Sequence, residues 1–358
     1  MSATQHGSVY LRPGGLLGGE AARCAVAQGK AGLIGGGWAA FSVVEVVERR
    51  GNGVQRNWQA YKDICASDDA VIADLLKRIE APRASVAGLA MSEPQIMGIV
   101  NVTPDSFSDG GAFLQSDVAV AHGKQLHAAG AGILDIGGES TRPGADYVSD
   151  EDEAKRVVPV FEGLKSLDVA LSIDTRKPSV MKRAVEAGAG MINDVTALTF
   201  ADDSEQTASD LAVPVCLMHA QGSPKTMQDN PQYDDVVLEV YDYLAARIRA
   251  CVAAGISVDR LVVDPGIGFG KTVRHNLALI DEIAMFHGLG VPILLGASRK
   301  SFIGAIMNDN DAGKRLPGSL VAALCGVRAG VQFLRVHDVA ETVQALQILY
   351  AGENSPQF

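Results

Sequence analysis

From residue 96 onward, short apolar runs alternate with longer segments of helical periodicity, and each run ends in a polar or glycine-rich turn. This alternation predicts parallel strands joined by crossover helices. The predicted strands are Ile96–Val100, Ile133–Ile136, Ala170–Ile173, Met191–Asn193, Val213–Met218, Leu261–Val263, Val291–Leu295 and Phe333–Val336. The predicted helices are Val118–Ala129, Asp150–Leu164, Ser179–Ala187, Asp234–Ala254, His275–Phe286, Ser319–Ala329 and Val339–Tyr350.

These units occupy residues 96–351, close to the ~250 residues typical of a (β/α)8 barrel. An open, doubly wound α/β sheet is the alternative, but it would concentrate its chemistry at one switch point. Here polar residues follow nearly every predicted strand. A barrel gathers its active site from the C-terminal ends of many strands. The pattern therefore predicts an α/β fold, a (β/α)8 TIM barrel formed by residues 96–358.

Residues 1–95 have a different character and predict a small N-terminal extension packed on the barrel. Two segments, Gly14–Gly19 and Gly32–Gly37, are rich in glycine. Phe41–Val47 has the composition of a strand, and Val71–Ile79 has the apolar spacing of one helix. This is too little for a second catalytic domain, and the sequence assigns the extension no function.

Composition excludes several classes of protein. The 358 residues are 47% apolar and 20% charged, and no stretch approaches the ~18 uninterrupted apolar residues of a membrane span. A net charge of −11 argues against nucleic-acid and membrane-surface binding. Five scattered cysteines without C-x-x-C spacing indicate reduced thiols. With no secretory signal at the N-terminus, we expect a soluble, cytoplasmic enzyme.

Two polar loops follow the first two predicted strands. Asn101 opens the first loop, and its carbonyl oxygen suits Mg²⁺ beside substrate phosphate oxygens. Phe107 in the same loop offers an apolar contact. In the second loop, two glycines allow the backbone to approach a ligand closely, and Arg142 can bind a phosphate through two hydrogen bonds. Either segment alone would be an ordinary surface connection, but two such loops at one barrel end favour a binding site.

Acceptor side chains follow the third, fourth and sixth strands. Asp174, Asn193 and Asp264 are expected to point into the barrel mouth. Carboxylate and amide oxygens suit a 2-amino-4-oxo heterocycle, whose ring N–H and amino groups donate hydrogen bonds. For Asp174, a helix cap near Pro178 is the alternative.

Two residues at the end of the fifth strand have competing interpretations. Met218 offers a polarizable face for a flat ring, although a lone Met in this position is as often part of the core. His219 is either a ligand contact or a structural histidine, and we favour the structural role. The segment after the sixth strand superficially resembles a P-loop, but Pro265 replaces its first glycine. Nucleotide hydrolysis is therefore rejected, and Phe269 is expected to line the pocket.

Cationic side chains follow the last two strands. Lys300 is expected to donate to a ring nitrogen or carbonyl of the heterocycle. Arg335 and His337 lie two residues apart on one strand end, point the same way and form a compact anion site. A single Lys or Arg is usually a solvated surface charge, but the strand-end position favours a functional role.

Together these segments resemble the dihydropteroate synthase family over essentially all of residues 96–351. The two most telling blocks are IMGIVNVTPDSFSDGG (Ile96–Gly111) and DIGGESTRPGA (Asp135–Ala145). They are joined, in the family's order, by SIDTRKP, MHAQGSPKTMQDNP, DPGIGFGK, SRKSFIG and RVHDVAE. So many ordered motifs make the resemblance highly specific. The long N-terminal segment departs from the family pattern and is too short for a fused pterin pyrophosphokinase domain.

The resemblance implies a role for each group of site residues. The pterin pocket would be formed by Asp174, Asn193, Met218, Asp264 and Lys300. The diphosphate would be bound by Asn101, Thr141, Arg142, Arg335 and His337, with Mg²⁺ on Asn101. The p-aminobenzoate site would be formed by Phe107, Pro143, Phe269, Lys300 and Ser301. The catalytic set would comprise Asp105 and Asp109 of the closing first loop with Thr141, Arg142, Lys300, Arg335 and His337.

The implied reaction condenses 6-hydroxymethyl-7,8-dihydropterin diphosphate with p-aminobenzoate, giving 7,8-dihydropteroate and pyrophosphate in folate biosynthesis. The sequence offers no Cys/His pair, Ser/His/Asp set or close carboxylate pair for covalent or strong base catalysis. The implied mechanism is therefore dissociative. Cations stabilise the departing pyrophosphate, the acids stabilise the cationic pterin, and the aryl amine then attacks. Loop closure would exclude water.

Two other functions are weighed against this one. A pterin-dependent methyltransferase would share the barrel but has no use for the Asn101 metal site or the Arg335/His337 pair. A catalytically silent pterin-binding paralogue is expected to lose part of the first two loops, and here both are whole. The family also implies a homodimer through the last helices and a sulfonamide target.

Overall fold

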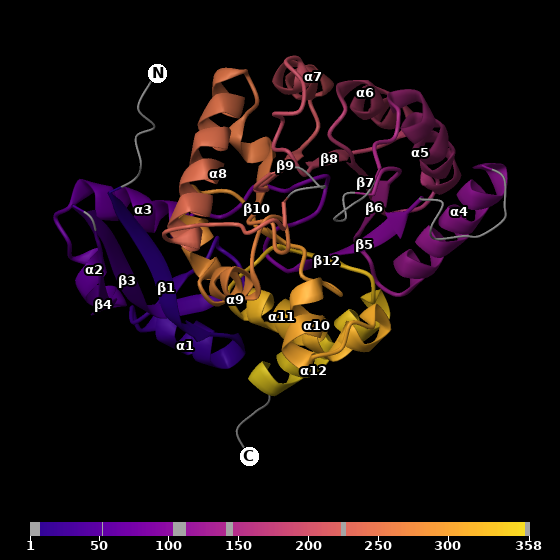
Figure 1. Ribbon diagram of the computed structural model, residues 1–358. Coiled ribbons are helices and arrows are strands. Elements are labelled where there is room, and N and C mark those ends of the chain that lie inside the picture. Colours follow the sequence, from indigo (N-terminus) through magenta and orange to yellow (C-terminus); the bar gives the residue numbers. More distant parts are fainter. Residues whose placement is uncertain (1–7, 52, 103–111, 141–145, 223–226, 355–358) are drawn as a thin grey trace.

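The computed structural model describes residues 8–51, 53–102, 112–140, 146–222 and 227–354, with only the backbone of 112–115 (Figure 1). Its centre is an eight-stranded parallel sheet with strand order β10-β9-β8-β7-β6-β5-β12-β11. A parallel bridge between Val263 and Ile293 joins the two ends of this order and closes the barrel. The (β/α)8 TIM barrel predicted from the alternating pattern is therefore confirmed.

Strands and helices alternate around the barrel. The strands are β5 (Gln95–Asn101), β6 (Ile133–Gly137), β7 (Ala170–Asp174), β8 (Met191–Asp194), β9 (Val215–Met218), β10 (Leu261–Asp264), β11 (Leu294–Leu295) and β12 (Phe333–Val336). The helices are α4 (Ala112–Ala128), α5 (Asp150–Leu164), α6 (Pro178–Ala187), α7 (Ser204–Leu211), α8 (Val236–Ala253), α9 (Val273–Asp281), α10 (Ser301–Met307), α11 (Leu316–Arg328) and α12 (Val339–Asn354). No helix in these described ranges is both long and apolar enough to cross a bilayer.

All eight predicted strands are present, and two of them begin later than predicted. β9 begins after Pro214 and β11 after Pro292, because proline has no N–H to donate to a sheet. The prediction of a single helix over His275–Phe286 is wrong. α9 ends at Asp281, and a 3₁₀ segment, η3 (Ile283–Leu289), follows it. Helices α7 and α10 were not predicted, since both are short and α7 has few apolar residues.

The N-terminal end of the barrel is filled by an apolar layer. That layer contains Met97, Ile133, Met191, Cys216, Val262, Leu294 and Phe333, from seven of the eight strands. Val86 and Met91, from the segment that leads into β5, are buried against it. We call residues 86–91 the plug segment. It closes one end of the barrel, so the open end lies at the C-terminal ends of the strands.

The residues before the plug segment form a lobe around an antiparallel sheet. Its elements are β1 (Val9–Leu17), α1 (Gly19–Ala27), β2 (Gly32–Leu33), β3 (Ala40–Arg50), β4 (Gly53–Ala60), α2 (Tyr61–Cys65) and α3 (Ala70–Glu80). β3 is central and contains the predicted strand, while α3 contains the predicted helix. Apolar side chains of α3, including Leu75 and Ile79, are buried against Leu11 and Val46 of the sheet. The division of the chain at residue 95 stays a prediction.

The lobe packs against one side of the barrel, beside α8 and α9 (Figure 1). Tyr10 of β1 donates its hydroxyl to Asp242 of α8 at 2.9 Å, and Arg49 of β3 forms an ion pair with the same carboxylate. Trp38 donates its indole N–H to the Val327 carbonyl of α11 at 2.9 Å. The lobe is therefore held by directional polar contacts as well as by apolar packing.

Candidate active site

Polar side chains meet where the parallel strands end. Asp174 is the last residue of β7 and pairs in register with Asn193 of β8. Asp264 is the last residue of β10 and pairs with Met218, the last residue of β9. Because parallel strands end at one edge of a sheet, the predicted pterin residues come together at the open end of the barrel. Their contacts with substrate stay predictions.

Arg335 of β12 joins two carboxylates at this end. Its Nε lies 2.6 Å from Asp135 Oδ2, and its Nη2 lies 2.7 Å from Asp174 Oδ2. Asn193 Nδ2 donates to the same Asp135 oxygen at 2.9 Å. The sequence interpretation did not identify Asp135 as a site residue. Its statement that no close carboxylate pair offers covalent or strong base catalysis stays a prediction. Asp135 and Asp174 share one guanidinium, which ties β6, β7 and β12 together.

This arrangement also changes the expected Arg335/His337 anion site. Two of the three guanidinium nitrogens of Arg335 already donate to carboxylates, so its positive charge is partly neutralised. His337 lies at the same strand end, with Nδ1 3.0 Å from Ser298 Oγ. A diphosphate role for either residue stays a prediction.

Burial and the shared cation set the charge of Asp174. Burial raises its pKa to about 7; Arg335 opposes that rise and the Asp135 carboxylate adds to it. Asp174 therefore keeps its proton up to near-neutral pH. Burial likewise raises the pKa of Asp264, although the Gly266 N–H, at 2.7 Å from Oδ1, and Lys300 favour its ionised form.

Lys300 and Phe269 lie in contact beside Asp264. The Lys300 ammonium is 4.0 Å from the centroid of the Phe269 ring, which is a cation–π contact. Lys300 occupies the N-cap position of α10 without a side-chain capping hydrogen bond, and Ser301 is the first residue of that helix. The structure thus brings Lys300, Ser301 and Phe269, three of the predicted p-aminobenzoate residues, to the same part of the barrel mouth.

A buried lysine that the sequence interpretation missed supports the loop after β10. Lys271 Nζ lies 2.9 Å from His219 Nδ1 and donates to the Phe269 carbonyl at 3.0 Å. Burial lowers the pKa of Lys271 to about 7, and burial beside that lysine lowers the pKa of His219 to about 2. His219 is therefore a neutral structural histidine, as the sequence interpretation favoured.

A buried ion network anchors the chain on both sides of residues 141–145. Glu139, before that segment, accepts from Arg176 at 3.1 Å and from the Val148 N–H, after the segment, at 3.1 Å. Lys177 donates to the Val148 carbonyl and to Glu153, both at 2.6 Å. We call these four charged residues the Lys177 network. It fixes both ends of the second loop beside the end of β7.

Several predicted residues lie outside the described part of the chain: Asp105, Phe107, Asp109, Thr141, Arg142 and Pro143. Asn101, the predicted Mg²⁺ ligand, is the last residue of β5 and pairs with Gly137 of β6 at the same end of the barrel. Its amide oxygen suits a hard cation, and the described residues contain no cluster of three His, Cys, Asp or Glu ligands. This donor set fits a metal held largely by substrate phosphates.

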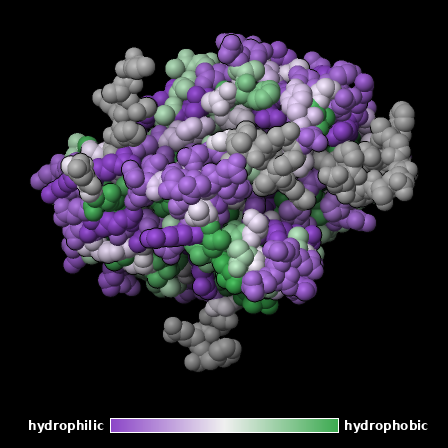
Figure 2. Space-filling view, in the orientation of Figure 1, coloured by the Kyte–Doolittle hydropathy of each residue, from purple (hydrophilic) through white to green (hydrophobic). Residues whose placement is uncertain are grey.

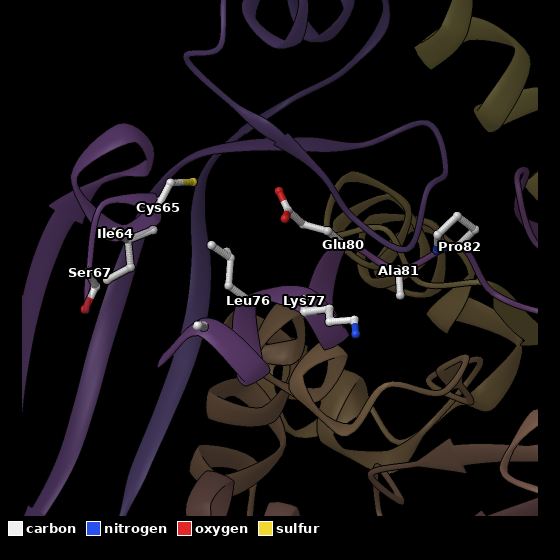
Figure 3. Close-up of a pocket in the computed structure, with 9 residues that line it drawn as sticks. Ile64, Cys65, Ser67, Leu76, Lys77, Glu80, Ala81 and Pro82 are labelled. Atoms are coloured by element: carbon white, nitrogen blue, oxygen red, sulfur yellow. The ribbon is translucent and has the colours of Figure 1, made fainter. Parts of the chain in front are cut away.

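A separate cavity of about 530 Å³ lies in the N-terminal lobe, between α2 and α3 (Figure 3). Ile64, Cys65, Leu76, Lys77 and Glu80 are among the residues that line it. None of the predicted site residues contributes to its wall, so it is not part of the candidate site.

We predict that Lys177→Met lowers the free energy of unfolding by about 3–5 kcal/mol, because it leaves the buried Glu153 carboxylate without its cation. Urea unfolding followed by circular dichroism measures the change. Lys155→Met is the matched control, since Lys155 on α5 is exposed and lies 3.8 Å from Glu151. Equal stability of the two variants would contradict a structural role for the network.

The raised pKa of Asp174 predicts a pH dependence of stability. Between about pH 4 and pH 7 the unfolded chain loses the Asp174 proton while the folded chain keeps it. Rising pH therefore lowers the free energy of unfolding over this range. Asp174→Asn should flatten this slope in urea titrations at a series of pH values, whereas Asp168→Asn at an exposed position should not. A slope unchanged by Asp174→Asn would show that this residue is ionised throughout.

Comparison with known proteins agrees with this geometry. The family model described as "Pterin binding enzyme" matches residues 97–337. The dihydropteroate synthase of Escherichia coli K12 is 47% identical over 264 residues, covering 74% of this chain and 93% of that protein. The corresponding enzyme of Neisseria meningitidis serogroup B is 49% identical over 265 residues, covering 73% of this chain and 93% of that protein.

Solved structures give the same answer. Xanthomonas albilineans dihydropteroate synthase with 4-aminobenzoic acid has a TM-score of 0.72 at 49% identity, covering 77% of this chain and 99% of that chain. The complex of that enzyme with 7,8-dihydropteroate has a TM-score of 0.69 at 46% identity, covering 77% of this chain and 100% of that chain. With its barrel, its strand-end acids and these relatives, the chain belongs to the dihydropteroate synthase family of pterin-binding TIM-barrel transferases.

Proposed function

We propose that this chain condenses 6-hydroxymethyl-7,8-dihydropterin diphosphate with p-aminobenzoate, releasing pyrophosphate and forming 7,8-dihydropteroate in a Mg²⁺-dependent reaction. The observation that carries this proposal is the set of acceptors at the barrel mouth. Asp174, Asn193 and Asp264 stand at three strand ends, where they match the N–H and amino donors of a pterin. Lys300 beside Asp264 supplies a donor for a ring nitrogen or carbonyl.

The mechanism follows from the charges of these groups. Asp174 and Asp264 stabilise the cationic pterin that remains when pyrophosphate departs. Arg142 and His337 bind the leaving group, and Arg335 contributes through Nη1, since Nε and Nη2 donate to carboxylates. Asn101 would hold Mg²⁺, which would supply further positive charge for the leaving group. No residue of the site is required as a covalent nucleophile.

The p-aminobenzoate site is proposed between Lys300, Ser301 and Phe269, with Phe107 and Pro143 contributed by the first two loops. The Phe269 ring gives an apolar wall, and the Lys300 ammonium attracts the carboxylate of the second substrate. A Yersinia pestis dihydropteroate synthase has been solved with a sulfonamide drug. The same drug class is proposed to compete with p-aminobenzoate here.

We also propose that the chain acts in the cytoplasm as a homodimer through its last helices. Four exposed apolar side chains support such an interface: Ile306 and Met307 on α10, Val321 on α11 and Ile348 on α12. Figure 2 shows apolar residues gathered low in the centre of the view, with further apolar groups elsewhere on the same face. The lobe contacts α12 through α1, so it borders this surface.

The test of the activity is pyrophosphate release from the pterin diphosphate with Mg²⁺, measured with and without p-aminobenzoate. We expect release that the amine stimulates, with dihydropteroate as the product. Tight binding of the pterin diphosphate without release would instead indicate a silent binding paralogue. Omission of Mg²⁺ tests the metal requirement in the same assay, and an unchanged rate would contradict it.

We predict that Lys300→Ala and Arg142→Ala each reduce turnover at least tenfold, which corresponds to a loss of ~1.4 kcal/mol of transition-state stabilisation. The first variant removes a donor to the pterin, and the second removes a cation for the diphosphate. Steady-state kinetics measures both. Lys182→Ala on the exposed face of α6 is the control and should retain the wild-type rate. Near-wild-type turnover in either test variant would refute its assignment.

A further inference from the structure

We propose that Asp135 is a positioning residue of the pterin site, which fixes the amide of Asn193 so that its oxygen faces the substrate. The inference rests on the pterin role proposed above for Asn193. Asp135 lies within β6, flanked in register by Ile99 of β5 and Ser172 of β7, and is fully buried. Burying an unpaired carboxylate costs several kcal/mol of folding free energy. The hydrogen-bond partners of Asp135 therefore indicate its role.

Those partners lie on two other strands. Asp135 Oδ2 accepts from Arg335 Nε at 2.6 Å and from Asn193 Nδ2 at 2.9 Å. The ion pair with Arg335 compensates for burial of the charge. The contact with Asn193 is not needed for that compensation, so its significance lies in the orientation of the amide.

The Asp135 oxygen that faces Asn193 also accepts from Arg335, so it acts as an acceptor toward both. The Asn193 amide must therefore direct its NH₂ group toward Asp135. Its oxygen, Oδ1, is then the atom that can accept a hydrogen bond from a ligand. Without this constraint the amide could rotate by half a turn and present a donor at nearly the same position. Asp135 thereby makes Asn193 an acceptor, like Asp174 and Asp264. Three acceptors select a ligand that presents N–H and NH₂ groups.

The second oxygen of Asp135 gives independent support. Oδ1 is buried and accepts no hydrogen bond from the described residues. Buried carboxylate oxygens nearly always have a partner, and an unsatisfied one indicates a donor contributed by a ligand or a water. This unsatisfied oxygen is on Asp135, the residue that orients Asn193. Such an oxygen is expected where the bound substrate donates the missing hydrogen bond.

The experiment compares Asp135→Asn with the exchange variant Asp135→Asn/Asn193→Asp. In the first, two amides face each other, and the one at position 193 can turn its NH₂ group toward the ligand. In the exchange variant the new amide at 135 donates to a carboxylate at 193, which again has an oxygen to offer. Calorimetry with 6-hydroxymethyl-7,8-dihydropterin diphosphate measures Kd, and steady-state assays give the KM for p-aminobenzoate.

We expect Asp135→Asn to raise the Kd of the pterin diphosphate about tenfold, the scale of one misdirected hydrogen bond, and the exchange to restore most of it. The KM for p-aminobenzoate should change little in either variant. Ser172→Ala is the matched control, because Ser172 is the register neighbour of Asp135 and its buried hydroxyl also lacks a partner among the described residues. It should bind as the wild type does.

Two outcomes would overturn the inference. One is unchanged binding by Asp135→Asn. The other is an exchange variant that binds no better than Asp135→Asn, which would show that Asp135 contributes charge or packing and not amide orientation. If Asp135→Asn does not fold, the exchange variant is compared with the wild type instead. A Kd close to that of the wild type would support the inference, and a Kd raised tenfold or more would contradict it. Failure of the wild-type chain to bind the pterin diphosphate would instead refute the proposed function itself.

Discussion

The ion pairs of Arg335 with Asp135 and Asp174 are the interaction on which the open end of the barrel depends. They place one positive and two negative side chains in a largely buried position, and they join three strands that are far apart in sequence. With fewer cations than acids, the group has a deficit of positive charge. A proton near neutral pH or a cationic ligand can make up that deficit. The cationic pterin of the proposed mechanism fits such a site.

The backbone plan of the barrel was predictable because its signals are local. Helix α5 matches its predicted bounds, since Ser149 caps it and four acidic residues occupy its first turn, where the helix dipole favours negative charge. The errors are local too: proline shortens β9 and β11, and short helices such as α7 carry too few apolar residues to show a period.

The site was only partly predictable, because pairing between distant residues does not appear in sequence patterns. Asp174 and Asp264 were found because they end their strands, and Asn193 because it is the next-to-last residue of its strand. Asp135 was missed because it lies inside an apolar strand, although an acid in such a strand is itself a signal that a cation lies nearby. Lys271 lies in a motif from which only Asp264 and Phe269 were assigned to the site, and its burial beside His219 depends on the tertiary fold.

The plug segment has a consequence for the limits of the domain. The family match begins at residue 97, yet Val86 and Met91 complete the apolar layer at the closed end of the barrel. A chain cut at the boundary suggested by similarity would leave Phe333 and its neighbours facing solvent. A chain that folds into this barrel therefore has to begin at or before Val86, upstream of residue 97, where the family model begins.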